Sequence, residues 1–190
     1  FWLKIGEGRS QGHCSRSLRH TAMSVLASLA TGPYIIPTNF LLSITPAAFQ
    51  PLNCIVHGVT STYLPMLMRV IAQARLGEPY DNNNPRGQLA RMAGKFPVFD
   101  RLNGAHINGL ETLPVFAAAM LAGLHAGIDK VRLSKLGTLW LGLRSAYLAM
   151  YLAQGPKTSS LRSVLFLWSM ALSCNLLREA AAKTASNGAA

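Results

Sequence analysis

Two groups of polar side chains interrupt long apolar stretches of this sequence, and their spacing places each group on one face of a helix. Asn108 and Glu111 are three residues apart, and Arg144, Tyr147 and Tyr151 follow one another at intervals of three and four residues. Side chains at such intervals are neighbours on a helix surface. Glu111 and Arg144 would then either form a buried ion pair that fixes the helix register or both bind a zwitterionic ligand. The spacing leaves these alternatives open.

Two arginines at the ends of apolar stretches extend this set of candidate residues. Arg75 ends the first stretch and Arg162 begins the last one. Basic residues in such positions usually reach toward lipid headgroups. A cation near a helix N-terminus opposes the helix dipole, so an anion bound there would be stabilised by Arg162 and by the helix together. His57, His106 and His125 lie far apart without a metal-binding spacing, so no metal site is expected.

The amino-acid composition narrows the class of protein. Half of the 190 residues are hydrophobic and only 13% are charged, against about 25% charged residues in a typical soluble domain. This excludes a disordered chain. Cys14, Cys54 and Cys174 are odd in number and far apart, which excludes a disulfide scaffold or a zinc ribbon, and the last two are expected to be inert. The net charge of +11 suits either nucleic-acid binding or a membrane protein with basic loops.

The positions of the charges favour the membrane alternative over nucleic acid. Residues 21–68 carry no charge, and Glu111 and Arg144 are the only charged residues in 102–128 and 136–156. A soluble helical bundle is the alternative, but its helices would show a polar face. Because a membrane span needs about 20 mostly apolar residues, we expect four spans, at residues 48–73, 104–127, 134–153 and 161–178.

The segments outside the spans give the expected domain organisation. We divide the chain into an N-terminal lead-in, a membrane domain and a flexible C-terminal tail, at residues 1–47, 48–178 and 179–190. Residues 1–22 are rich in Arg and Ser, which is typical either of a targeting segment or of translated sequence upstream of Met23. Four prolines predict an irregular stretch over 31–51. The basic loop at 74–103 is expected to face the cytoplasm.

The stretch from Arg101 to Pro114 resembles the second-helix signature of the MAPEG family, membrane-associated proteins in eicosanoid and glutathione metabolism. Ala105, Asn108, Glu111 and Pro114 match its Ala-x-x-Asn-x-x-Glu-x-x-Pro spacing. Further similarities lie in His106, in Ala72–Arg75, in Leu161–Val164 and in the face formed by Arg144, Tyr147 and Tyr151. The resemblance covers about residues 48–178 and is to the microsomal glutathione transferases among the family's members.

This resemblance implies an all-α fold, a transmembrane four-helix bundle that forms a homotrimer. Glutathione would bind between neighbouring subunits near the cytoplasmic face. Arg162 would face its sulfur and favour the thiolate, and Ser163 would donate a hydrogen bond. The residues that would bind the tripeptide, carried over by position, are Arg75, His106, Asn108, Glu111, Arg144, Tyr147 and Tyr151.

The sequence also departs from the family pattern. Gly104 stands where enzymatic members usually carry arginine, Thr112 where some carry tyrosine, and the turn before the fourth span is longer. We expect a glutathione-dependent transferase or peroxidase that acts on lipophilic electrophiles or lipid peroxides in the endoplasmic reticulum or another organelle membrane. The alternatives are a non-catalytic lipid-binding or scaffold member of the family, which Gly104 favours, and an unrelated transporter that uses Glu111 and Arg144 as a relay.

Overall fold

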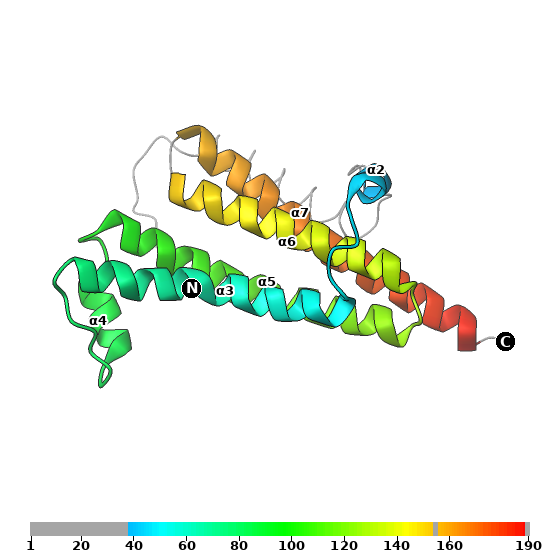
Figure 1. Ribbon diagram of the computed structural model, residues 1–190, viewed down its shortest axis with the longest axis horizontal. Coiled ribbons are helices and arrows are strands. Elements are labelled where there is room, and N and C mark those ends of the chain that lie inside the picture. Colours follow the sequence, from blue (N-terminus) through cyan, green and yellow to red (C-terminus); the bar gives the residue numbers. More distant parts are fainter. Residues whose placement is uncertain (1–37, 154–155, 189–190) are drawn as a thin grey trace, which may run out of the picture. The chain divides into compact units, whose positions relative to one another are not determined.

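The computed structural model describes residues 38–153 and 156–188, and all regular structure in these residues is helical (Figure 1). The helices are α2 (Thr38–Ile44), α3 (Pro51–Arg75), α4 (Pro85–Met92), α5 (Pro97–His125), α6 (Lys130–Ala153) and α7 (Pro156–Gly188). The predicted all-α class is therefore confirmed. The interpretations of residues 1–22 and of Cys14 lie outside the described residues.

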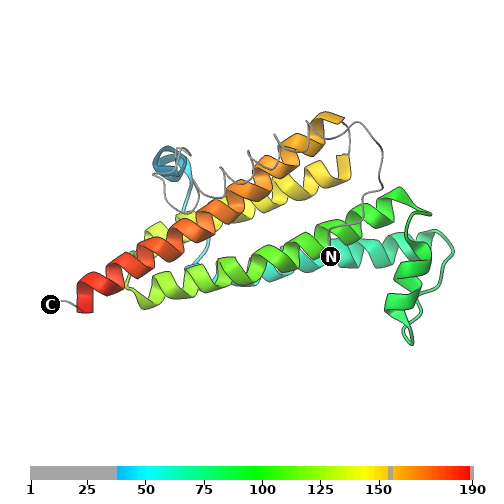
Figure 2. The same ribbon diagram turned by 180° about the vertical axis from the view of Figure 1, so that it is seen from behind.

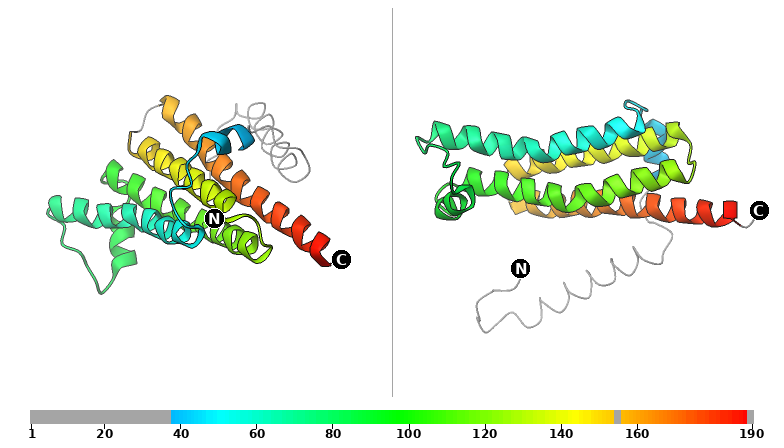
Figure 3. Two further views of the ribbon diagram at one scale, coloured as in Figure 1. Left: turned by 45° about the vertical axis from the view of Figure 1, so that its right-hand side comes forward. Right: turned by 90° about the horizontal axis from the view of Figure 1, so that it is seen from below.

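Four long helices, α3, α5, α6 and α7, run side by side, and each is antiparallel to the one before it (Figures 1 and 3). Seen from behind, α5 lies next to both α3 and α7 (Figure 2). The short α4 crosses the end at which α3 stops and α5 starts. This order brings the C-terminal half of α6 and the start of α7 to the same end as α4.

Prolines and glycines explain where several helices begin and end. In α3, α4 and α5 a proline occupies the first turn, where a missing backbone N–H has no consequence. Each of these three helices is followed by a glycine with positive φ, which most side chains disfavour. The three glycines and their φ angles are Gly77 at 75°, Gly94 at 79° and Gly127 at 70°.

The buried hydrophobic core lies largely between the C-terminal half of α5 and the N-terminal half of α6. The Trp140 ring of α6 stacks on the Phe116 ring of α5, with centroids 3.9 Å apart and planes 6° apart. Cys54 of α3 is fully buried in the same cluster. It packs against Gly137, where an added Cβ would lie 2.7 Å from the Cβ of Cys54. The absence of a side chain at this position therefore lets α6 approach α3 closely.

The close approach at Gly137 gives a stability prediction. We expect Gly137→Ala to lower the unfolding temperature, because overpacking a filled core costs about 1–3 kcal/mol. Gly142→Ala on the same helix is the matched control, since nothing lies within 4 Å of a Cβ there. It should leave the unfolding temperature equal or higher, because alanine favours helices over glycine by up to about 1 kcal/mol. Thermal unfolding in detergent measures both, and equal temperatures for the two variants would contradict the packing.

Three of the long helices are apolar enough to cross a membrane. Among the described residues, α3, α5 and the part of α7 from Ser160 have the length and the apolar composition that a membrane span needs. About a third or less of the most apolar stretch of each is buried within the protein. Most of their apolar surface therefore faces away from the rest of the described chain. The predicted third span, 134–153, falls in α6, which does not meet the requirement. Arg144, three aromatic residues and two glycines lower the hydropathy of that stretch.

Several boundaries differ from the sequence-based expectation. Part of the expected irregular stretch at 31–51 is the helix α2, because the seven residues from Thr38 to Ile44 contain no proline. The expected loop 74–103 contains α4, whose first turn is capped by the Asn84 side chain accepting from the Gly87 N–H at 2.9 Å. The expected flexible tail is helical through Gly188, since its many alanines are good helix formers.

Candidate functional site

One face of α6 carries the row of residues that the spacing predicts. Arg144 and Tyr147 are buried, with 7% and 4% of their surface exposed. The guanidinium carbon of Arg144 lies 4.4 Å from the centroid of the Tyr147 ring. The Tyr147 and Tyr151 rings follow with centroids 5.5 Å apart. The three side chains thus form a continuous stack along the helix.

The start of α7 adds a second cation to this row. The guanidinium carbon of Arg162 lies 4.4 Å from the centroid of the Tyr151 ring. Such contacts are favourable because the face of an aromatic ring is electron-rich. Arg144, Tyr147, Tyr151 and Arg162 therefore form one contact chain from α6 to α7, with an arginine at each end.

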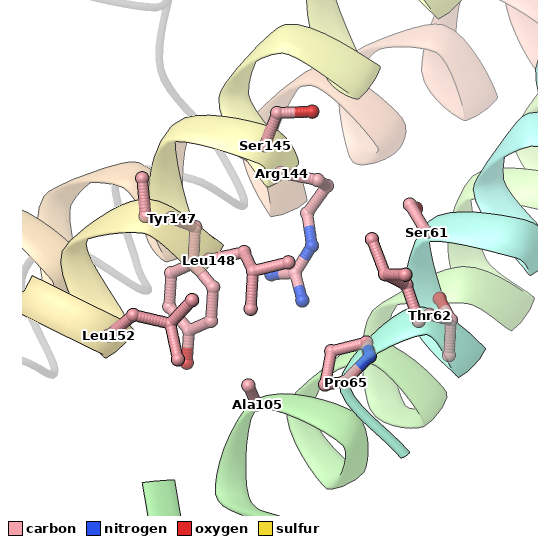
Figure 4. Close-up of a pocket in the computed structure, with 12 residues that line it drawn as sticks. Ser61, Thr62, Pro65, Ala105, Arg144, Ser145, Tyr147, Leu148 and Leu152 are labelled. Atoms are coloured by element: carbon pink, nitrogen blue, oxygen red, sulfur yellow. The ribbon is translucent and has the colours of Figure 1, made fainter. Parts of the chain in front are cut away.

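A cavity of about 300 Å³ opens between α3, α5 and α6 beside Arg144 (Figure 4). Figure 4 shows the Arg144 side chain extending from α6 toward Thr62 and Pro65 of α3, and the Tyr147 hydroxyl directed toward Ala105 of α5. The rest of the lining is largely apolar, with Leu64, Leu148, Ala149 and Leu152 among its members. The cavity is thus an apolar space with one guanidinium and a few hydroxyl groups.

The Arg144 guanidinium is incompletely paired. Its Nη1 is buried and has no hydrogen-bond partner among the described residues. Burying an unpaired polar group costs free energy, and a charged one costs more. An acceptor that entered the cavity, such as a carboxylate, would recover that cost. The arrangement therefore suits an anionic group with an apolar body.

Glu111 does not pair directly with Arg144. The Glu111 side chain on α5 is exposed, and within the described residues no ion pair joins it to Arg144. The structure thus does not form the buried ion pair that was one alternative, and the shared zwitterionic ligand stays a prediction.

Two other predicted residues make contacts within or between helices. His106 Nδ1 lies 2.9 Å from the Thr62 carbonyl oxygen, so the protonated nitrogen donates a hydrogen bond from α5 to α3. The Asn108 side-chain amide donates to the Gly104 carbonyl oxygen of its own helix at 2.9 Å. Both side chains are half-buried. Arg75 and Ser163 are exposed, at the end of α3 and in the first part of α7.

The surroundings of Gly104 show what fills the space that a side chain at this position would occupy. A Cβ at this position would collide with the Tyr151 hydroxyl, which reaches over from α6. The space that a larger side chain on α5 would occupy is therefore filled by Tyr151. Tyr151 in turn contacts Arg162. The glycine on α5 therefore leaves room for the Tyr151 side chain, which links the residues of α6 to Arg162 of α7.

Sequence reasoning missed a second arginine within the bundle, Arg69, which is hydrogen-bonded. Arg69 lies one turn beyond Pro65 on α3, and its Nη1 donates to the Asn103 side-chain oxygen of α5 at 2.7 Å. Its guanidinium carbon lies 5.4 Å from the centroid of the Phe99 ring, and its buried Nε has no partner among the described residues. The available signal was its position inside the expected first span, where a charge is costly.

Comparison with known proteins identifies the family. The sequence model of the MAPEG family matches residues 53–182, which is more than half of the chain. The chain belongs to the MAPEG family. No curated protein and no solved structure matches the chain. Family membership, together with three helices that can span a membrane, makes it an integral membrane protein with a role related to glutathione or eicosanoid metabolism.

The MAPEG match includes all of the predicted site residues. They lie on α3, α5, α6 and α7, and each of these helices falls largely within the matched region. Among the described residues, no group of three His, Cys, Asp or Glu side chains is placed to hold a metal ion. The charged residue that lines the cavity of this MAPEG protein is Arg144, and a guanidinium suits the binding of a carboxylate.

Proposed function

We propose that this protein is a glutathione-dependent transferase that acts on lipophilic electrophiles dissolved in the bilayer, with peroxidase activity on lipid peroxides as a related reaction. The observation that carries the proposal is the buried, unpaired Nη1 of Arg144 in an apolar cavity. Glutathione has two carboxylates, and a guanidinium can donate two parallel hydrogen bonds to the oxygens of one of them. The exposed Glu111 then meets the α-ammonium group of the same tripeptide.

The chemistry follows from the far end of the contact chain. Arg162 supplies a cation that is held against the Tyr151 ring, and a nearby cation favours a thiolate over a thiol. The glutathione thiol releases its proton to water, and its sulfur bonds to the electrophilic carbon while the leaving group departs with the bonding electrons. Ser163 adds a hydrogen bond to the sulfur, Tyr147 lines the cavity, and Arg75, His106 and Asn108 complete the binding residues.

The proposal includes a membrane arrangement in which residues 48–178 form the membrane domain. The third of the four spans is α6, whose 24 residues extend about 36 Å against a hydrocarbon core of about 30 Å. Arg144 is sheltered in the cavity instead of facing lipid. The protein lies in the membrane of an organelle such as the endoplasmic reticulum, and the basic segment 74–103 faces the cytoplasm. Three copies of the chain form a homotrimer. Cross-linking that stops at a dimer would contradict the trimer.

The decisive experiment is a conjugation assay on the purified protein in detergent. We expect glutathione to react with a generic aromatic electrophile, 1-chloro-2,4-dinitrobenzene, faster than in protein-free detergent. Calorimetry on the same sample measures glutathione binding separately from turnover. If the folded protein binds no glutathione, the proposal is wrong in both its binding and its catalytic parts.

A second candidate is a non-catalytic lipid-binding or scaffold member of the same family. The observation that favours it is Gly104, where α5 contributes no side chain to the site and Tyr151 fills the space. In that case the Arg144 cavity holds the head of an amphipathic lipid. Binding of a fatty acid without any glutathione binding would support this second candidate over the first.

A further inference from the structure

A cleft at the other end of the helices combines basic side chains with apolar neighbours. Its volume is about 300 Å³, and it lies between α2 and the first turns of α6, which are adjacent in Figures 1 and 3. The lining residues are Leu42, Ser43, Asp129, Val131, Arg132 and Lys135. None of them belongs to the Arg144 cavity, since Lys135 lies nine residues before Arg144, or about 13 Å along the helix.

Three charged residues line this cleft, Asp129, Arg132 and Lys135, and two of them have contacts that hold them in place. The Arg132 guanidinium donates to both carboxylate oxygens of Glu179, at 2.8 and 2.9 Å. The Asp129 carboxylate accepts the backbone N–H of Arg132 at 2.9 Å, which caps α6. These contacts neutralise the arginine and satisfy one oxygen of the aspartate.

Lys135 is the lining cation without a carboxylate partner. Its ammonium group donates to the Leu42 backbone carbonyl at 3.2 Å, and it forms no ion pair within the described part of the chain. A lysine ammonium has three N–H donors. Two donors and a full positive charge therefore remain for a ligand in the cleft.

In the membrane arrangement proposed above, the position of Lys135 along α6 corresponds to the membrane surface. It lies five residues, or about 7 Å, from the start of a helix that is about 36 Å long, close to the level at which a hydrocarbon core of about 30 Å ends. Exposed apolar side chains lie on the two helices that form the cleft, α2 and α6. Phe40, Ile44 and Val131 are 63%, 64% and 55% exposed, which suits contact with acyl chains.

We propose that this cleft binds the phosphate group of a membrane phospholipid. Lys135 Nζ donates to the phosphate oxygens, and the acyl chains lie against Phe40, Ile44 and Val131. Basic pockets at the membrane surface suit lipid headgroups because their cations attract the anionic phosphate. The site lies apart from the proposed glutathione site, so the two proposals can fail independently.

Native mass spectrometry of the full chain in detergent, titrated with phosphatidylglycerol, tests the site. We expect Lys135→Gln to weaken phosphatidylglycerol binding about tenfold, because a charge-assisted hydrogen bond is lost, and Lys135→Arg to keep it. Lys183→Gln is the matched control. Lys183 also donates to a backbone carbonyl, that of Gly127, but it is exposed and lies outside the cleft. This control should bind phosphatidylglycerol like the wild type.

Two simpler ligands separate the contributions of the headgroup and the chains. Diacylglycerol has the acyl chains without the phosphate, and glycerol phosphate has the phosphate without the chains, so each should bind more weakly than phosphatidylglycerol. Equal binding of diacylglycerol would overturn the role of Lys135, and equal binding of glycerol phosphate would overturn the role of the lipid. Unchanged phosphatidylglycerol binding by Lys135→Gln would also refute the proposal, whatever the outcome of the glutathione assay.

Discussion

Arg162→Ala is expected to abolish most glutathione conjugation while leaving glutathione binding nearly unchanged. Arg162 is half-buried at the start of α7, and its contact in the described structure is the Tyr151 ring. Within the described residues, the Arg162 guanidinium therefore forms no ion pair with a carboxylate. A cation beside sulfur stabilises the thiolate, and each unit by which the thiol pKa rises lowers the thiolate fraction about tenfold below that pKa. Turnover and binding are measured by the conjugation assay and by calorimetry.

The pH dependence distinguishes this role from a structural one. Because the cation stabilises the deprotonated sulfur, its removal raises the pKa of the bound thiol, and the loss of rate is largest at low pH. Raising the pH restores the thiolate, so the rate of Arg162→Ala should approach that of the wild type at alkaline pH. A variant that is merely misfolded would stay inactive at every pH.

Two further variants serve as controls for Arg162. Arg162→Lys keeps the charge but loses the planar stacking on Tyr151, so we expect an intermediate rate. Arg178→Ala removes an arginine from the same helix 16 residues away, or about 24 Å, and should leave conjugation unchanged. If Arg162→Ala conjugates glutathione at the wild-type rate across the pH range, Arg162 has no role at the sulfur.

The helical architecture could be predicted because apolar stretches between basic residues are a strong signal. The expected spans and the long helices agree to within several residues at most ends, where proline and glycine mark the boundaries. The helix α2 was missed because its surroundings are dense in proline, although the seven residues from Thr38 contain none. The end of α7 was missed because hydropathy marks the lipid contact, whereas an alanine-rich helix continues beyond it.

The candidate site could be predicted along each helix but not between helices. Intervals of three and four residues correctly place Arg144, Tyr147 and Tyr151 on one face of α6, because helix geometry alone determines that face. The contact of Tyr151 with Arg162 depends on how α7 packs on α6. The missing ion pair between Glu111 and Arg144 depends on the rotation of α5 relative to α6. Spacing within one helix carries no information about either.

Replacement of Arg144 by methionine should weaken glutathione binding strongly without destabilising the protein. The guanidinium is buried with one nitrogen unpaired, and a buried charge without a full set of partners contributes little or nothing to stability. An apolar side chain of similar length should keep the unfolding temperature equal or raise it. The ligand carboxylate, however, loses a charge-assisted hydrogen bond of about 1.5–3 kcal/mol, or roughly 10- to 150-fold in affinity.

Arg132→Met provides the matched comparison because it reverses both expectations. Arg132 lies on the same helix, and both of its contacting nitrogens are paired with Glu179. Since this ion pair is partly exposed, its loss should cost at most about 1 kcal/mol of stability and leave glutathione affinity unchanged. Calorimetry and thermal unfolding of the two variants therefore give opposite patterns. Wild-type glutathione affinity in Arg144→Met would show that the unpaired guanidinium does not hold a carboxylate, and the cavity would then belong to another ligand.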